Sequence, residues 1–416
     1  MTWSMRDSTG GTAARLIAAG VELARDEGLP ALSARALAER ADSSPSALNY
    51  HLGGREPLLE HVLDHAMRAA ADWCAERLAD VRDEAGAPAW LSPAGALAAI
   101  IGDRVTALRT WTLLLAEFEA QVETGESAVL AARLGKQIAA TDRFWREAAQ
   151  ALGESETHAA IWSDLAIGLT QLLLSDEPVA VKAPWIVDSA NRLHARLQGH
   201  APRPLLERPL GAAERLSNDA PVGESARKLL DAALRIIAEK GAERLTQRDV
   251  AAAAGLSLAA TTYFFRTKAD LVTAAFHELH RQVSAQALAT ADAARTLLGS
   301  TLEDDGERAA WRVRAMEALQ LTSAREASLA PIARELRATR GATSIIWLRA
   351  QGLQVDRLDA FIFSTAMAGV VQRTRFAAPG RRRDEMAESQ ARLLSNLFGW
   401  PGQGEEAGPF ASLKSP

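Results

Sequence analysis

The sequence predicts an all-α fold in which one helical module occurs twice. Apolar residues three and four positions apart run through alanine-rich segments over most of the 416 residues, and the alternation typical of β-strands is nearly absent. Glycine and proline fall mainly between these segments. In addition, residues 15–59 align with residues 228–272 without a gap, at a shift of 213 positions. The chain is 48% hydrophobic and 24% charged, so disorder as its main state is excluded.

Identical residues in the two copies support the repeat. They include Leu16/Leu229, Ala19/Ala232, Gly28/Gly241, Leu32/Leu245, Arg35/Arg248, Ala38/Ala251, Ala41/Ala254, Ser44/Ser257, Ala47/Ala260, Tyr50/Tyr263 and Leu58/Leu271. Alanine pairs mean little in so alanine-rich a chain, but the only two tyrosines fall on the same aligned position. A weaker similarity between the two copies follows downstream, where Phe144, Trp145 and Gly168 correspond roughly to Ile346, Trp347 and Gly369. We therefore infer two copies of a module of about 200 residues.

The first copy begins with three short-range helix signals. Leu16, Ala19 and Leu23 place an amphipathic helix that ends at Gly28, a residue suited to the left-handed position after a helix. Ser33 caps a second helix, 34 to about 40. After a break at 41–43, Ser44 and Pro45 provide a cap residue and a proline at the first helical position of a third, short helix over 46–51.

The second copy repeats these signals. Gly241 ends its first helix, Thr246 caps the second, Gly255 lies in the turn and Ser257 caps the third. A helix, a tight turn and a second helix form the helix-turn-helix arrangement, in which the N-terminal residues of the second helix meet base edges in the major groove. The spacing and its double occurrence predict two DNA-binding heads.

These residues resemble the DNA-binding domain of TetR-family transcriptional regulators. In copy 2 the resemblance is carried by residues 232–234, Gly241, residues 245–251, residues 254–257, residues 263–265 and Lys268, and in copy 1 above all by residues 44–56. Members of the family are ordinarily half this length and act as homodimers. The resemblance therefore implies a tandem fusion whose two halves pair within one chain as a pseudo-dimer, through helices at roughly 155–175 and 356–376. Further dimerisation of two whole chains stays open.

The resemblance also implies which residues contact double-stranded operator DNA. The start of the third helix would face bases, with Asn49 and Thr262 one turn on, both tyrosines would bond phosphate, and cations at the starts of the second and fourth helices would meet phosphates or nearby base edges. The expected DNA-binding residues are Arg35, Ser44, Pro45, Ser46, Ala47, Asn49, Tyr50 and Arg55 in copy 1, and Arg248, Ser257, Leu258, Ala259, Ala260, Thr262, Tyr263 and Lys268 in copy 2. Alternatively, the tyrosines are half-buried packing residues, the arginines are solvated surface charges, and Ser44 and Ser257 serve only as caps.

Two features distinguish the copies. Copy 1 has Asp42 where copy 2 has Gly255, and a carboxylate near DNA is unfavourable unless it serves only the turn. Residues 12–60 hold five Arg and seven Asp plus Glu, net −2, whereas residues 224–275 hold eight Arg plus Lys and six Asp plus Glu, net +2. Copy 2 is thus expected to bind DNA more strongly.

The expected organisation follows from these segments. Residues 1–60 and 224–275 form the two helix-turn-helix domains, and residues 61–198 and 276–400 form helical effector and pairing domains. A proline-rich linker spans 199–223, and a disordered tail spans 401–416.

The tryptophans suggest an effector site in the first body. Six lie there, against Trp311 and Trp347 in the second, so we expect large flat walls around a small apolar or aromatic effector. The candidate lining residues are Trp111, Phe118, Trp145 and Trp162. The alternative is that each aromatic ring only fills the core.

Composition and sequence pattern argue against several other classes of protein and binding site. The net charge of −5 argues against indiscriminate binding of polyanions, and Cys74 as the single cysteine excludes a disulfide framework and fits a reducing cytoplasm. No apolar run is long enough for a membrane span, and residues 1–12 lack a secretory signal pattern. His61, Asp64 and His65 lie on one helical stretch, with the histidines at ligand-like i, i+4 spacing. Two histidines without a third nearby ligand are usually solvated, so we expect no metal, and we expect no cofactor.

Together, these observations predict a cytoplasmic, ligand-responsive repressor that binds an asymmetric operator of two half-sites. One alternative is an interaction protein in which only copy 2 binds DNA. The other is an all-α enzyme, which needs clustered His and carboxylates or a nucleophile with a base. Against it, the sequence shows no Glu-x-x-His pair on facing helices.

Overall fold

The computed structural model describes residues 4–84, 92–123, 128–200, 223–291 and 307–400. These residues form helices, turns and connecting loops without any strand, so the all-α prediction is confirmed. Most of the expected linker 199–223 and all of the expected tail 401–416 lie outside the described residues.

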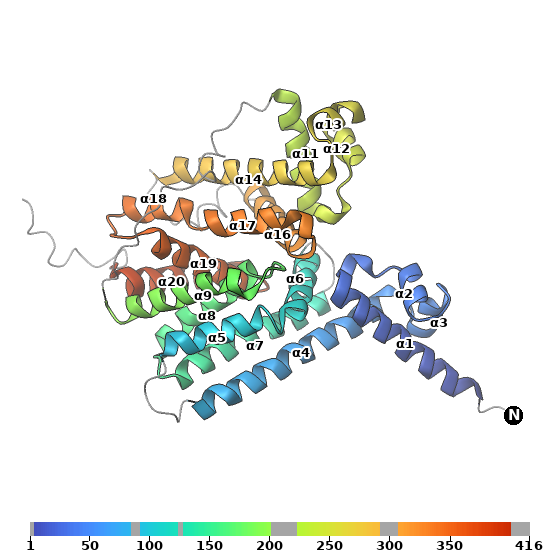
Figure 1. The fold of residues 1–416 in the computed structure, drawn as a ribbon, viewed down its shortest axis with the longest axis horizontal. Helices are drawn as coiled ribbons and strands as arrows, with labels where there is room; N and C mark the ends of the chain where they lie inside the picture. The colour runs from blue at the N-terminus through green and yellow to red at the C-terminus, as the bar shows by residue number, and fades with distance from the viewer. Residues whose placement is uncertain (1–3, 85–91, 124–127, 201–222, 292–306, 401–416) are drawn as a thin grey trace, which may run out of the picture.

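The first half of the chain supplies one head and one helical body (Figure 1). Its helices are α1 (Ser4–Glu27), α2 (Ala34–Arg40), α3 (Ala47–Leu52), α4 (Arg55–Glu84), α5 (Pro93–Arg104), α6 (Arg109–Glu123), α7 (Ala128–Ala151), α8 (Glu156–Leu172) and α9 (Val179–Leu197). A 3₁₀ turn, η1 (Leu29–Ala31), joins α1 to α2.

The second half repeats the head and builds a second body. Its helices are α11 (Glu224–Lys240), α12 (Gln247–Ala254), α13 (Leu258–Phe264), α14 (Lys268–Ala291), α16 (Glu307–Arg325), α17 (Ala330–Thr339), α18 (Ala342–Ala350), α19 (Arg357–Arg373) and α20 (Pro379–Phe398). The 3₁₀ turns η2 (Ala242–Arg244) and η3 (Ala327–Leu329) precede α12 and α17.

Most of the local signals act as the sequence predicts. Gly28 and Gly241 end the first helices at φ values of 88° and 83°, where a side chain would be strained. The cap residues Ser33, Thr246 and Ser257 accept hydrogen bonds from the backbone N–H three residues on. The predicted bounds of α2 therefore hold.

The start of α3 differs from the prediction. The helix begins at Ala47 instead of residue 46, and Ser46 occupies the cap position without a side-chain cap bond. Ser44 does not cap the helix, because its hydroxyl faces that of Ser46 at 3.0 Å and its carbonyl accepts from the Ala47 N–H. Residues 44–47 thus form a tight turn ahead of the helix.

Asp42 takes the part that Gly255 plays in copy 2. Its φ is 48°, in the left-handed region, and Gly255 has φ 66° at the aligned position. Aspartate is among the few non-glycine residues that tolerate this region. The departure from the repeat therefore serves the turn between α2 and α3.

The two bodies pack against each other through α8 and α19, while both heads lie on the same side of the molecule, at the right in Figure 1. Contact between α8 and α19 is the most extensive of any helix pair in the described part of the chain. These are the segments through which the sequence predicts the halves to pair.

Glycines permit the close approach of α8 and α19. A Cβ built on Gly168 would lie 2.0 Å from the carbonyl oxygen of Thr365, and one built on Gly369 would lie 1.8 Å from that of Asp164. Backbone therefore touches backbone at the crossing. Gly168 and Gly369 are the glycines that correspond in the weak downstream repeat, so the crossing joins equivalent points of the two halves.

Buried ion pairs flank this crossing. Asp164 on α8 is fully buried and accepts from Arg373 at 3.0 Å and from Arg392 at 3.1 Å. On the other side, Arg196 on α9 donates to Asp359 at 2.5 Å. Removing one partner of a buried pair leaves an uncompensated charge, so loss of either side of these contacts would destabilise the junction of the two halves.

Candidate nucleic-acid interface and effector pocket

The two tyrosines stand out from the third helix of each head. Tyr50 on α3 is 78% exposed and Tyr263 on α13 is 81% exposed, the largest values among the exposed large hydrophobic residues described. Each ring meets the next aromatic residue, His51 or Phe264, edge to face at about 5 Å. The half-buried packing alternative is therefore wrong, and both phenols are free to reach a partner.

The outer face of α3 and of the turn before it is polar. Ser44, Pro45, Ser46 and Asn49 are exposed there. Ala47 is not, because it is 8% exposed and packs in a small apolar cluster of the head with Leu16, Ala19 and Ala41. The expectation that the Ala47 side chain faces bases is corrected: it lies on the inner face of the turn.

The outer face of α13 is more apolar than that of α3. Ser257, Leu258, Ala259 and Thr262 are exposed on it, and Ala260 is half-buried. Phe264, which the sequence analysis did not single out, is 40% exposed beside Tyr263. The sequence signal was the run 263–265, of which only Phe265 turns into the core.

The four expected cations divide into two pairs. Arg35 and Arg248, near the starts of α2 and α12, are exposed and make no ion pair within the described part of the chain. Arg55, at the start of α4, donates instead to the carbonyls of Leu32 and Leu29 at 3.3 and 3.4 Å. Lys268, at the start of α14, donates to the Glu243 carbonyl at 2.6 Å.

These three hydrogen bonds give Arg55 and Lys268 a structural role that the sequence did not reveal. Both cations are half-buried, and each satisfies carbonyl groups of the 3₁₀ segment of its own head, η1 or η2. They tie the long helix of the body to the turn before the second helix. Any contact with DNA phosphate would compete with these hydrogen bonds.

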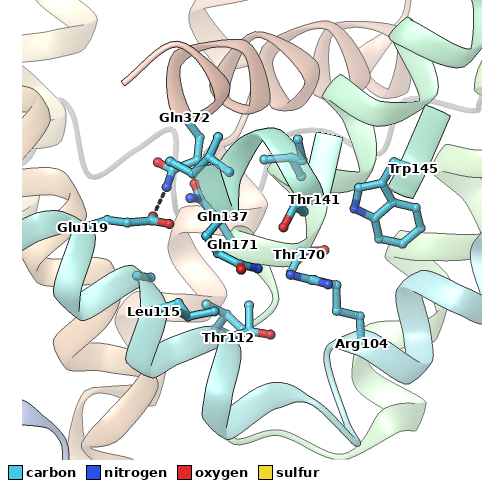
Figure 2. Close-up of a pocket in the computed structure, with 14 residues that line it drawn as sticks. Arg104, Thr112, Leu115, Glu119, Gln137, Thr141, Trp145, Thr170, Gln171 and Gln372 are labelled. Carbon is cyan, nitrogen blue, oxygen red and sulfur yellow. Dashed lines mark hydrogen bonds between the residues drawn. The ribbon is translucent and has the colours of Figure 1, made fainter. Parts of the chain in front are cut away.

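A small pocket lies between the first body and α19 of the second, where α5, α6, α7, α8 and α19 meet (Figure 2). Its volume is about 50 Å³. Apolar walls alternate with polar groups, and the lining residues are Arg104, Thr112, Leu115, Ala116, Glu119, Gln137, Ile138, Thr141, Trp145, Ile167, Thr170, Gln171, Leu174 and Gln372. Gln372 comes from the second half, so the pocket spans the junction of the two bodies.

Of the four aromatic residues predicted to line an effector site, Trp145 alone does so. Phe118 and Trp162 are each 1% exposed and belong to the hydrophobic core, and Trp111 is half-buried against that core. These three rings pack against neighbouring helices and do not border the pocket. The core-filling alternative therefore holds for these three residues.

Two charged groups lie at opposite ends of the pocket in Figure 2. Glu119 accepts from the Gln372 amide and lies 3.8 Å from Arg375. Burial raises the pKa of Glu119 to about 7, against the pull of Arg375. At the other end, Arg104 is 4% exposed, and burial lowers the pKa of its guanidinium.

A larger cleft of about 680 Å³ separates the two heads beside α6 and α16. Glu117 on α6 accepts from the Leu29 N–H at 3.0 Å and from Arg325 on α16 at 2.6 Å. Arg325 also donates to the Arg25 carbonyl at 2.9 Å. This Glu117–Arg325 clasp joins the first head to helices of both bodies.

Asp64 and His65, two of the three residues with ligand-like spacing on α4, make contacts with other protein groups. Asp64 pairs with Arg133, and the His65 ring lies 2.9 Å from the His61 carbonyl. No group of three potential metal-ligating side chains occurs in the ranges that the structure describes. Within the same ranges, no helix combines the length and the apolar character needed to cross a membrane.

Comparison with known proteins matches both heads to one protein family. The family described as bacterial regulatory proteins, tetR family, matches residues 16–62 and 229–275, two ranges related by the same shift of 213 positions as the internal repeat. No curated protein matches the chain. Among solved structures, the multidrug binding protein EbrR, complexed with imidazole, is 25% identical, and the match covers 47% of this chain and 100% of that one with a TM-score of 0.32. Both heads therefore belong to the tetR family of bacterial regulatory proteins, and the chain carries this domain twice in tandem.

Proposed function

We propose that this protein is a cytoplasmic, ligand-responsive repressor whose two heads bind one operator together. The observation that carries the proposal is the placement of two heads, with exposed tyrosines on their third helices, on the same side of the two packed bodies (Figure 1). A covalent connection makes binding by the second head an intramolecular event, so a single chain suffices where an ordinary regulator needs two.

The two heads present different side chains to DNA. The exposed face of α3 carries Ser46 and Asn49, whereas that of α13 carries Leu258, Ala259 and Thr262. Different side chains read different base edges, so the operator consists of two unlike half-sites about one helical turn or more apart. The half-site of the second head contributes more affinity, because residues 224–275 carry net +2 against net −2 for residues 12–60.

Helix α6 supports a connection between effector and operator. Thr112, Leu115 and Glu119 of this helix line the pocket, and Glu117 of the same helix binds the first head and Arg325. A ligand that fits the pocket better when the heads are wrongly spaced lowers operator affinity by its preference between the two states.

Footprinting combined with mass measurement of the complex tests the single-chain arrangement. We expect one chain on an asymmetric site and no sigmoidal dependence of binding on protein concentration. A symmetric minimal operator that needs two chains would contradict the proposal.

The second candidate is an interaction protein in which only the second head binds DNA, favoured by the acidic balance of copy 1 and the exposed Asp42. A matched pair of variants separates the two: Ser46→Asp and Ala259→Asp each place one carboxylate on one exposed face. If both heads bind, each variant loses protection of its own half-site. If S46D leaves the footprint and the affinity unchanged while A259D abolishes both, the second candidate is right.

A further inference from the structure

One end of the pocket holds buried donors without acceptors. The indole Nε1 of Trp145 and the hydroxyl of Thr170 make no hydrogen bond in the described structure, and these residues are 1% and 3% exposed. Figure 2 shows the Arg104 guanidinium reaching into the same space beside Thr170. A buried donor left without an acceptor destabilises the folded state, so such groups suggest a missing partner.

Arg104 adds an under-compensated charge to this end. Its contacts are the Cys74 sulfur at 3.9 Å and the face of the Trp73 ring at 5.2 Å, and no carboxylate of the described residues lies within ion-pair distance. Buried cations are ordinarily paired with anions. The carboxyl of Glu119 acts on Arg104 only as a favourable charge at a distance and forms no ion pair with it, because it bonds Gln372 and lies near Arg375 at the opposite end.

The size of the pocket limits its occupant. An engineered cavity of about 150 Å³ binds benzene. The volume of about 50 Å³ here is about a third of that and favours an occupant smaller than an aromatic ring. It admits a molecule of a few non-hydrogen atoms, with an alkyl part against Leu115, Ile138 and Ile167.

We propose that this pocket binds a small aliphatic monocarboxylate, with its carboxylate held by Arg104, Trp145 and Thr170. A carboxylate supplies two acceptor oxygens that match the guanidinium fork and can also take the indole N–H and the hydroxyl. The three residues belong to α5, α7 and α8, so the anion joins three helices of the first body. The proposal rests on the proposed function only in naming this ligand as the effector.

Titration of the full chain with acetate, propionate and butyrate tests the site without DNA. Tryptophan fluorescence and the midpoint of thermal unfolding are followed at constant ionic strength, with chloride and the neutral acetamide as matched controls. We expect a saturating response to acetate or propionate and none to acetamide or chloride, because the charge is what the donors recognise. A response that fails to saturate, or one equal for acetamide, overturns the proposal.

Variants then identify the site. Arg104→Met should weaken propionate binding by roughly tenfold or more, while Arg143→Met, which removes an exposed charge from α7, should leave it unchanged. Thr170→Val has a signature that a merely structural residue lacks: it should raise the unfolding midpoint of the free protein by removing an unsatisfied hydroxyl, yet weaken propionate binding. Unchanged binding in both R104M and T170V refutes the site.

The two proposals fail separately. Carboxylate binding that saturates but leaves the footprint unchanged would support the anion site and contradict its role as the effector site. Loss of DNA binding in the footprinting experiment would contradict the proposed function and leave the titration result in place.

Discussion

Substitution of the crossing glycines tests the packing of the two halves. In Gly369→Ala the new Cβ would lie 1.8 Å from the Asp164 carbonyl oxygen, and in Gly168→Ala it would lie 2.0 Å from that of Thr365. Carbon and oxygen ordinarily approach to about 3.3 Å. Each variant therefore needs α8 and α19 to separate by more than about 1 Å at their closest point.

The cost follows from two opposing effects. Alanine in a helix is more favourable than glycine by about 0.5–1 kcal/mol. Overpacking costs typically about 1–3 kcal/mol, and the separation also weakens dispersion contacts along the crossing. We expect each variant to be destabilised by roughly 1–2 kcal/mol net. Because one separation of the helices relieves both clashes, the double variant should cost less than the sum.

Chemical unfolding followed by tryptophan fluorescence measures this effect through the midpoint and slope of the transition. Gly102→Ala is the matched control, because Gly102 lies in α5 and a Cβ there would meet nothing within 4 Å. The control should be stabilised while G168A and G369A are destabilised. Stabilisation of all three variants alike would refute the backbone-to-backbone crossing.

Three further predictions concern the heads and the pocket. Tyr263→Phe should weaken binding to specific and random duplexes alike, because it removes a hydroxyl that donates a hydrogen bond to a DNA phosphate. A loss of affinity confined to one sequence would contradict this role. Thr262→Val should change the selected consensus at one position of one half-site, and an unchanged consensus would remove Thr262 from the reading face. Glu119 has a pKa raised to about 7 from 4.5, so the folded state binds more protons than the unfolded state in this window, and the free energy of unfolding should fall as pH rises from about 4.5 to 7. Glu119→Gln should flatten that dependence in unfolding experiments across pH, and an unaltered slope would show that another group causes it.

Local signals in the sequence were enough to predict the heads. Gly28, Ser33, Thr246 and Ser257 act within one turn of their own positions, so backbone geometry and hydrogen-bonding capacity decide their roles before any tertiary contact forms. Because the second copy aligns with the first at a shift of 213 positions, the same signals predicted the helices of the second head. The start of α3 was the exception, since Ser44 and Pro45 suit a turn as well as a cap.

Residues that act at a distance could not be assigned in this way. The sequence marks Arg55 and Lys268 as cations at helix starts, but only the fold brings them to the carbonyls of the 3₁₀ turns. Similarly, only the direction in which residues 44–47 turn sends Ala47 into the apolar cluster of the head. These roles depend on how one helix is placed against another.

The pocket also shows the difference between what local sequence signals predict and what depends on helix packing. Composition indicated a first body rich in tryptophan, yet packing decided that Trp162 fills the core and Trp145 borders a space. Arg104 and Thr170 are separated along the chain and meet because α5 and α8 pack in one bundle. Periodicity and capping depend on residues within a few positions of one another, so they can be read from the sequence. A cavity depends on how long helices pack against each other, so its lining follows from the packed fold alone.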